Sequence, residues 1–186
     1  MKRIVGVLAI QGDFERHLAM LDALGRPGRE VRTPRDLAGV GALIIPGGES
    51  TTLLKFFDLD GWWGPLRAFV RTHPVMGTCA GAILMATRVT NPPQPSLGLL
   101  PMMVERNAYG RQLDSFETEL KDHLLGGGPL PAVFIRAPKF LEVERGVEVL
   151  ARHKGRPVMV RKGRYLALAF HPELTGDDRV HRLFLE

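Results

Sequence analysis

The feature that most constrains this chain is a repeated pairing in its first half, where a short apolar run is followed each time by an amphipathic stretch. Three such pairs occur: Ile4–Ile10 with Phe14–Leu24, Gly41–Ile45 with Ser50–Phe57, and Val75–Thr78 with Ala80–Thr87. Apolar runs bounded by turn glycines, each leading into a helix, are typical of a parallel sheet with helices on both faces. The pattern therefore predicts an α/β fold.

The second half of the chain has a different pattern, dominated by extended segments. We expect strands near 97–105, 115–120, 132–136, 147–153, 157–162 and 165–170, several of them antiparallel, with a tight turn at Lys162-Gly163-Arg164 and a closing helix over Gly176–Leu185. Hydrophobic residues make up 45% of the 186 residues, which is enough for one core. We predict a single domain over 1–186, a three-layer sandwich with a mostly parallel central sheet flanked by helices and antiparallel strands in the C-terminal half.

Composition limits where the chain acts and what it binds. The apolar run Ile4–Ile10 is much shorter than the ~20 residues of a membrane-spanning helix, so we expect neither a signal segment nor a membrane partner. The single cysteine fits a reducing compartment, and we expect a cytoplasmic protein. The net charge is +5, but acidic residues interrupt the basic cluster at 145–164 and no aromatic series accompanies it, so we do not expect nucleic acid binding.

The cysteine lies in the segment Gly77-Thr78-Cys79-Ala80-Gly81, between a predicted strand and a predicted helix. This is the Gly-x-nucleophile-x-Gly arrangement of a nucleophile elbow, whose sharp turn leaves no room for side chains at the two glycines. It would also place the sulfur at a helix N-terminus, where the dipole stabilises a thiolate. A small buried thiol without chemistry is the alternative that this segment alone leaves open.

A base for the cysteine is available in Ala169-Phe170-His171-Pro172-Glu173, at the end of a predicted strand. Residues two apart in an extended chain project to the same side, and proline biases the residue before it toward extended geometry. We therefore expect Glu173 to orient the His171 imidazole, which would serve Cys79. A surface histidine beside a strand end is the alternative. The remaining histidines show no metal-ligand spacing, and we predict no metal.

A third motif again joins a strand to a helix through glycines: Ile44-Ile45-Pro46-Gly47-Gly48-Glu49-Ser50-Thr51. Acyl transfer generates an oxyanion, which backbone N–H groups near glycine can approach closely. We expect the N–H groups of Gly48 and Ala80 to act as the two donors. A phosphate-binding turn and an ordinary strand-to-helix connection remain open, although the segment lacks the lysine of a P-loop.

Taken together, these residues resemble the glutaminase subunits of pyridoxal 5′-phosphate synthase, which are class I, triad-type glutamine amidotransferases. The resemblance covers nearly the whole chain and is carried by GVLAIQGDFERHL, LIIPGGESTT, PVMGTCAGAILMA, VERNAYGRQLDSFE, FIRAP and LALAFHPEL. The elbow and the His-x-Glu pair are shared by many amidotransferases. PGGEST and VERNAYGRQLDSFE narrow the resemblance to this subunit.

The resemblance implies hydrolysis of L-glutamine to glutamate and ammonia, with Cys79 forming a γ-glutamyl thioester, His171 as general base and then acid, and Glu173 as the orienting carboxylate. It implies a glutamine site lined by Gly47, Gly48, Glu49, Arg106, Ile135 and Arg136. It implies no cofactor, pyridoxal 5′-phosphate being the product of the complex, and an activating (β/α)₈-barrel synthase subunit that receives the ammonia.

Three alternatives keep parts of this interpretation. The same fold could serve another amidotransferase, such as one of histidine biosynthesis, or an intracellular cysteine peptidase. A non-enzymatic protein with Cys79 as a redox sensor is the third. Glutamine as the sole substrate, without peptide cleavage, separates an amidotransferase from a peptidase, and peroxide sensitivity without glutamine turnover even beside the synthase would favour the redox sensor.

Overall fold

The computed structural model describes residues 3–106 and 115–186. Its main element is an eight-stranded sheet with the strand order β2-β1-β3-β4-β13-β12-β11-β8. The strands span β1 Val5–Leu8, β2 Gly28–Val31, β3 Ala42–Ile45, β4 Val75–Thr78, β8 Asp122–His123, β11 Glu148–His153, β12 Arg156–Lys162 and β13 Tyr165–Leu168. Strands β1, β3 and β4 are buried along their whole length, as expected for strands covered on both faces.

The sheet changes character along its width. From β2 to β13 all neighbours are parallel, whereas β13, β12, β11 and β8 pair antiparallel. The turn at Gly163 and Arg164 joins β12 to β13, as predicted. The expected fold class is therefore confirmed, including the antiparallel addition from the C-terminal half.

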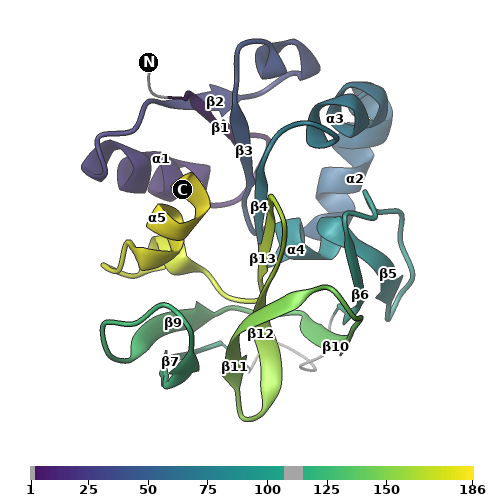
Figure 1. The fold of residues 1–186 in the computed structure, drawn as a ribbon. Coiled ribbons are helices and arrows are strands. Elements are labelled where there is room, and N and C mark those ends of the chain that lie inside the picture. Colours follow the sequence, from purple (N-terminus) through teal and green to yellow (C-terminus); the bar gives the residue numbers. More distant parts are fainter. Residues whose placement is uncertain (1–2, 107–114) are drawn as a thin grey trace.

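Helices cover both faces of the sheet. Figure 1 shows α1 and α5 on one face and α2, α3 and α4 on the other, so the molecule has three layers. The helices span α1 Phe14–Ala23, α2 Ser50–Leu59, α3 Trp63–Val70, α4 Ala80–Met85 and α5 Arg179–Leu185. Each turns its apolar side to the sheet; α1, for example, buries His17 and Leu21.

Two smaller sheets flank the main one. The first has the order β10-β6-β5, with β5 Ala86–Thr90, β6 Leu100–Glu105 and β10 Lys139–Val143, and the second pairs β7 Phe116–Leu120 with β9 Leu130–Phe134. Two 3₁₀ helices, η1 Pro34–Leu37 and η2 Pro172–Leu174, complete the elements of the described residues. Strand β9 lies next to η2 and so helps to position the second motif.

Several elements differ from the sequence-based expectation. Strand β2 was not predicted, because it is the polar, largely exposed edge strand of the sheet. Helix α3 was not predicted either, and α4 ends at Met85, two residues early, where the β-branched Thr87, Val89 and Thr90 form β5 instead. Strand β13 ends at Leu168, two residues before its predicted end.

The tandem tryptophans at the start of α3 are part of the packing between α2 and α3. Trp62 is fully buried and stacks on Phe57, with ring centroids 5.6 Å apart. Trp63 is half-buried, meets Phe57 edge-on and donates from Nε1 to Asp58 Oδ1 over 2.8 Å. Trp62 is therefore a core residue, and Trp63 packs against the core from its edge.

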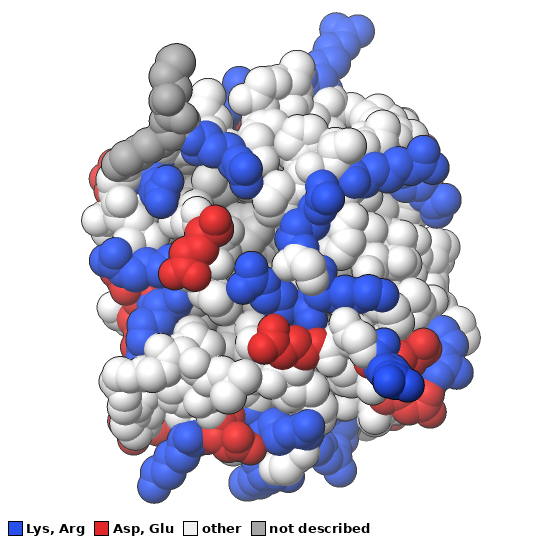
Figure 2. Space-filling model, in the orientation of Figure 1, with Lys and Arg blue, Asp and Glu red and all other residues white. Residues whose placement is uncertain are grey.

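Charged side chains are distributed over the surface. Figure 2 shows Lys and Arg side chains spread over one face of the molecule, with acidic side chains lying among them. Within residues 3–106 and 115–186, no helix has the length and apolar character required to cross a membrane.

Candidate active site

The three motifs meet at one edge of the sheet. Strands β3, β4 and β13 are parallel neighbours, so the residues that follow their carboxyl ends lie together. The Cys79 N–H donates to Leu168 O over 2.9 Å and joins the ends of β4 and β13. The His171 N–H donates to Val133 O over 2.8 Å, which ties the second motif to β9.

Cys79 occupies the strained turn expected of a nucleophile elbow. Its φ of 49° and ψ of −105° are rare for a residue with a side chain, and α4 begins at the next residue, Ala80. A Cβ on Gly81 would lie 2.0 Å from the backbone oxygen of Ile45, so only glycine permits this close contact between α4 and β3. The thiol is buried, and its sulfur lies 3.8 Å from Ile135 O.

His171 and Glu173 are in direct contact, although for a different reason than predicted. The His171 Nδ1 lies 2.7 Å from Glu173 Oε1, and both side chains are buried. The strand has already ended, however, and Pro172–Leu174 forms the 3₁₀ helix η2 with His171 as its N-cap residue. His171 itself is extended, as predicted, but the chain does not stay extended through Pro172 and Glu173, and the tight helical turn brings the two side chains together.

The environment of His171 favours its protonated form. Burial opposes the imidazolium, but hydrogen bonds to Cys79 and Glu173, together with their negative charges, raise the pKa of His171 to about 10. With Nδ1 directed at Glu173, the remaining ring nitrogen, Nε2, is the one that serves Cys79. The site is thus arranged to hold a proton on the imidazole beside the sulfur.

Gly47 lets the loop between β3 and α2 pack directly against His171 and Cys79. A Cβ at Gly47 would lie 2.3 Å from His171 Cε1 and 3.2 Å from Cys79 Cβ. Any side chain here would displace the imidazole. The next residue, Gly48, has a φ of +132° and lines the cavity beside Cys79. Of the two predicted oxyanion donors, Gly48 thus lines the cavity and Ala80 follows Cys79 in the chain, and the role of their N–H groups stays a prediction.

A cavity of about 190 Å³ opens beside Cys79. It is lined by Asp13, Gly48, Glu49, Ser50, Cys79, Ile83, Arg106, Ile135, Arg136 and His171. Its volume lies below the roughly 300–1,000 Å³ of pockets that hold drug-sized ligands, which suits a small metabolite. Of the predicted glutamine-site residues, all except Gly47 line it, and Gly47 lies behind His171.

Arg106 is the buried cation of this cavity. Its Nη1 donates to Gln94 Oε1, its Nη2 lies 3.7 Å from Glu49 Oε1, and its Nε has no hydrogen-bond partner among the described residues. Glu49 is the N-cap residue of α2. Burial raises the pKa of Glu49, but hydrogen bonds from Thr51 and the charge of Arg106 outweigh it and lower that pKa. Both charges are therefore present at the mouth of the cavity.

Ile135 and Arg136 contribute backbone to the site. Arg136 has a φ of 43° and an exposed side chain, and the carbonyl of Ile135 faces the Cys79 sulfur. The central part of the VERNAYGRQLDSFE motif, residues 107–114, lies outside the described residues.

Sequence reasoning missed two sets of residues here. Asp13, after β1, lines the cavity, and its carboxylate lies within 4.8 Å of ligand atoms of His171 and Glu173, a grouping that could hold a metal ion. Our expectation of no metal stays a prediction. His17 and His181 form the second set: both are buried, and His17 Nε2 lies 3.4 Å from Glu173 Oε2. The GDFERHL segment marks the position of His17, but no local signal indicates the contact.

Comparison with known proteins agrees with this geometry. The family model of the SNO glutamine amidotransferases matches residues 7–186. A pyridoxal 5′-phosphate synthase subunit PdxT of Thermus thermophilus is 52% identical over 189 residues, covering 100% of this chain and 98% of its own length. The PdxT of Koribacter versatilis is 52% identical over 182 residues, covering 98% of this chain and 94% of its own. The chain belongs to the SNO glutamine amidotransferase family.

Solved structures support the same assignment. A crystal structure described as a glutamine amidotransferase is 50% identical, with a TM-score of 0.89, and covers 97% of this SNO family chain and 96% of its own. The structure of PurLQS from Thermotoga maritima, at 16% identity, has a TM-score of 0.70 over 100% of this chain and 98% of the matched one. At that identity the likeness shows the shared fold alone.

Proposed function

We propose that this chain is the glutaminase subunit of a pyridoxal 5′-phosphate synthase and hydrolyses L-glutamine to L-glutamate and ammonia. The observation that carries the proposal is the buried group of Cys79, His171 and Glu173 in a chain 52% identical to PdxT over its whole length. The relatives reported above are named as subunits of pyridoxal 5′-phosphate synthase, which favours this reaction over histidine biosynthesis and over a redox-sensing role.

The reaction follows from the arrangement of the side chains. The Cys79 thiolate attacks the carboxamide carbon of glutamine, and the Gly48 and Ala80 N–H groups stabilise the resulting oxyanion. His171, already protonated because of its raised pKa, gives its Nε2 proton to the leaving nitrogen. The C–N bond breaks, ammonia leaves and a γ-glutamyl thioester remains on Cys79.

The second half of the cycle reverses these proton movements. His171, now neutral, takes a proton from a water molecule that attacks the thioester carbon. The C–S bond breaks, glutamate is released, and the thiolate and the imidazolium are restored. Glu173 keeps the imidazole Nδ1–H directed away from Cys79 throughout, at 2.7 Å.

The cavity supplies groups for both ends of a free amino acid. Arg106, Ile135 and Arg136 line it together with Gly48 and Glu49, while Gly47 packs against His171 beside it. An arginine suits a carboxylate and an acid suits an ammonium group. We propose that these residues hold L-glutamine, that no cofactor or metal takes part, and that residues 1–186 act as one domain in the cytoplasm.

We further propose that a (β/α)₈-barrel synthase subunit receives the ammonia and activates the glutaminase. Support comes from the names of the relatives, which are subunits of a synthase. Gly47 and Gly48 provide a physical route, because a glycine pair can reverse a peptide plane at little steric cost and so complete the oxyanion hole in the complex.

A covalent trap tests the proposal. The chain, alone and with the barrel subunit, is incubated with a diazoketone analogue of L-glutamine, and the modified peptide is mapped by mass spectrometry. We expect one adduct, on Cys79, that excess L-glutamine prevents and excess D-glutamine does not. Modification elsewhere, or equal protection by both enantiomers, contradicts a glutamine site at Cys79.

A further inference from the structure

The triad carboxylate has a second partner that the proposed reaction does not use. Glu173 directs Oε1 at His171, while its Oε2 lies 3.4 Å from Nε2 of His17 on α1. The side chains of His17 and Glu173 are both 0% exposed. His17 Nε2 also lies 3.5 Å from the hydroxyl Oγ1 of Thr78, and Glu173 Oε2 has no hydrogen-bond partner among the described residues. A buried carboxylate oxygen needs a donor, and His17 is the group placed to supply one.

His17 is itself contacted by a third buried histidine. Its Nδ1 lies 3.0 Å from Nε2 of His181, which comes from α5 at the other end of the chain. The side chain of His181 is completely buried, and its Nδ1 has no hydrogen-bond partner among the described residues. The contacts therefore run in one line, from His181 through His17 and Glu173 to His171.

His17 and His181 are both neutral. Burial lowers the pKa of His17 well below its ordinary value, and electrostatic interactions with His181 and His171 lower that pKa further. Burial also lowers the pKa of His181 to about 4, with Asp178 acting in the opposite direction. Each ring therefore carries one N–H, and the contacts decide which nitrogen holds it.

Only one placement of these two N–H protons gives each of them an acceptor. If His181 Nε2–H donates to His17 Nδ1, then His17 Nε2–H faces the carboxylate, and the unpartnered His181 Nδ1 is only a lone pair. In the opposite distribution, the lone pair of His17 Nε2 would face Glu173 Oε2, and the buried His181 Nδ1–H would have no acceptor. An unpartnered buried donor beside a lone-pair repulsion is the costlier arrangement.

We propose that His17 and His181 are positioning residues of the active site, which hold the Glu173 carboxylate in place by donating along the line His181 to His17 to Glu173. Fixing Oε2 leaves Oε1 directed at His171 Nδ1, and so keeps the imidazole aimed at Cys79. This inference rests on the proposed function, since it assigns a role in that reaction.

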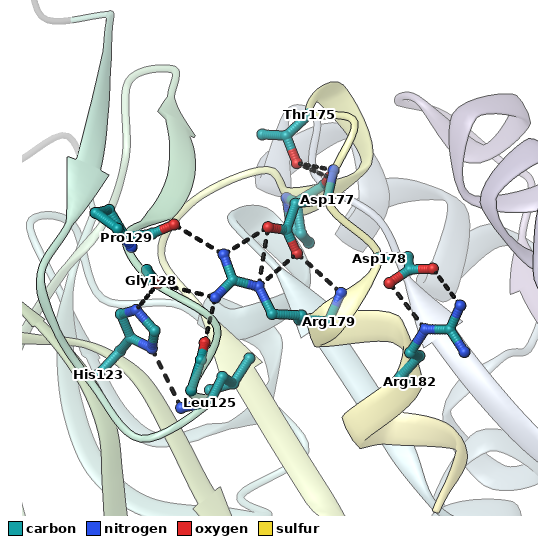
Figure 3. Close-up of polar contacts among 11 residues, drawn as sticks. His123, Leu125, Gly128, Pro129, Thr175, Asp177, Asp178, Arg179 and Arg182 are labelled. Carbon is teal, nitrogen blue, oxygen red and sulfur yellow. Dashed lines mark hydrogen bonds and ion pairs between the residues drawn. The ribbon is translucent and has the colours of Figure 1, made fainter.

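Ion pairs surround α5, the helix that carries His181, and Figure 3 shows those of Arg179 with Asp177 and Arg182 with Asp178. Arg179, the first residue of α5, binds Asp177 through Nε and Nη2 and donates to the carbonyls of Gly126, Gly128 and Pro129. These carbonyls precede β9, whose Val133 O accepts the His171 N–H. One network thus fixes α5, which carries His181, relative to the strand that positions His171.

The first experiment compares substitutions at His17 that differ in a single donor. A glutamine at this position places an amide N–H near the former Nε2, whereas leucine fills similar space without a donor. Leu21→Ala, one turn further along the buried face of α1, is the matched control for packing loss. Glutamine hydrolysis is measured for each variant with the barrel subunit present.

We expect His17→Leu to lower kcat by about 10-fold to 100-fold with little change in KM, and His17→Gln to keep kcat within about 3-fold of the unaltered chain. Leu21→Ala is expected to keep kcat once folded. A His17→Leu variant that folds and matches Leu21→Ala in kcat overturns the proposal.

The second experiment needs no variant. Nitrogen-15 NMR of histidine-labelled, unaltered chain reports which ring nitrogen carries the proton. We expect His17 protonated on Nε2 and His181 protonated on Nε2; a proton on His17 Nδ1 overturns the proposal. This result stands apart from turnover, so absence of any Cys79-dependent glutamine hydrolysis would remove the proposed function while the proton positions still test the geometry.

Discussion

Acidification from about pH 7 to about pH 5 is expected to weaken the fold through a defined group, His181. In the folded chain its pKa is lowered from the ordinary 6.5 to about 4, because the ring is buried. Between these two values the unfolded state binds more protons than the folded state, so the free energy of unfolding falls as the pH falls. The contribution is complete above 6.5 and is lost as the pH approaches 4.

The magnitude follows from the size of this interval. One proton of difference changes the free energy of unfolding by about 1.4 kcal/mol per pH unit, so the span from 6.5 to 5 corresponds to about 2 kcal/mol for His181. His17 acts in the same direction, since its pKa is also lowered. His171 does not contribute to the acid loss, because its raised pKa gives stability that is present below 6.5 and is lost toward about 10.

Urea unfolding at the two pH values measures this effect in the unaltered chain, in His181→Gln and in Val180→Ala. The glutamine removes the titration, whereas Val180→Ala removes buried apolar contacts on the same helix without changing a charge. We expect the unaltered chain to lose about 2 kcal/mol more than His181→Gln, and Val180→Ala to keep the full loss. Equal losses in the unaltered chain and His181→Gln would refute the reasoning.

Three substitutions probe the catalytic arrangement with the barrel subunit present. His171→Asn should lower kcat by at least about 1,000-fold, because triad members act as a unit; near-normal turnover excludes His171 as the acid and base. Gly47→Ala should lower kcat by about 100-fold, because its Cβ would lie 2.3 Å from His171 Cε1, and an unchanged kcat would show that the imidazole tolerates the shift. Arg106→Gln should raise the KM for glutamine by about 10-fold with a smaller change in kcat; an unchanged KM removes Arg106 from the glutamine site.

The sequence was most informative where a buried strand leads into a helix. The runs around Val5–Leu8, Ala42–Ile45 and Val75–Thr78 are apolar throughout, because helices cover both faces of these strands. The elbow at Cys79 could be predicted, because its glycines reflect a contact within a few residues of the chain and with the adjacent strand. Strand β2 could not be predicted, because an edge strand with an exposed Arg29 and a partly buried Glu30 has no apolar pattern.

Features that depend on contacts between distant segments were beyond sequence reasoning. His17 and His181 are 164 residues apart and meet only because α1 and α5 pack on the same face of the sheet. The contact between His171 and Glu173 and the extended backbone of His171 were predicted, but extended chain through Glu173 was wrong, since the chain turns into η2 at Pro172. Proline fits the first turn of a helix as well as it fits extended chain, so the residue alone does not decide.

The central claim is that Cys79 hydrolyses glutamine for a partner synthase. The most direct test is ammonia release from L-glutamine by the unaltered chain and by Cys79→Ala, each alone and mixed with the barrel subunit. We expect release that requires Cys79 and rises sharply with the barrel subunit, and a Cys79→Ala variant that still binds that subunit. Release that is indifferent to the barrel subunit would contradict the assigned partner, and no release under any of these conditions would contradict the assigned reaction.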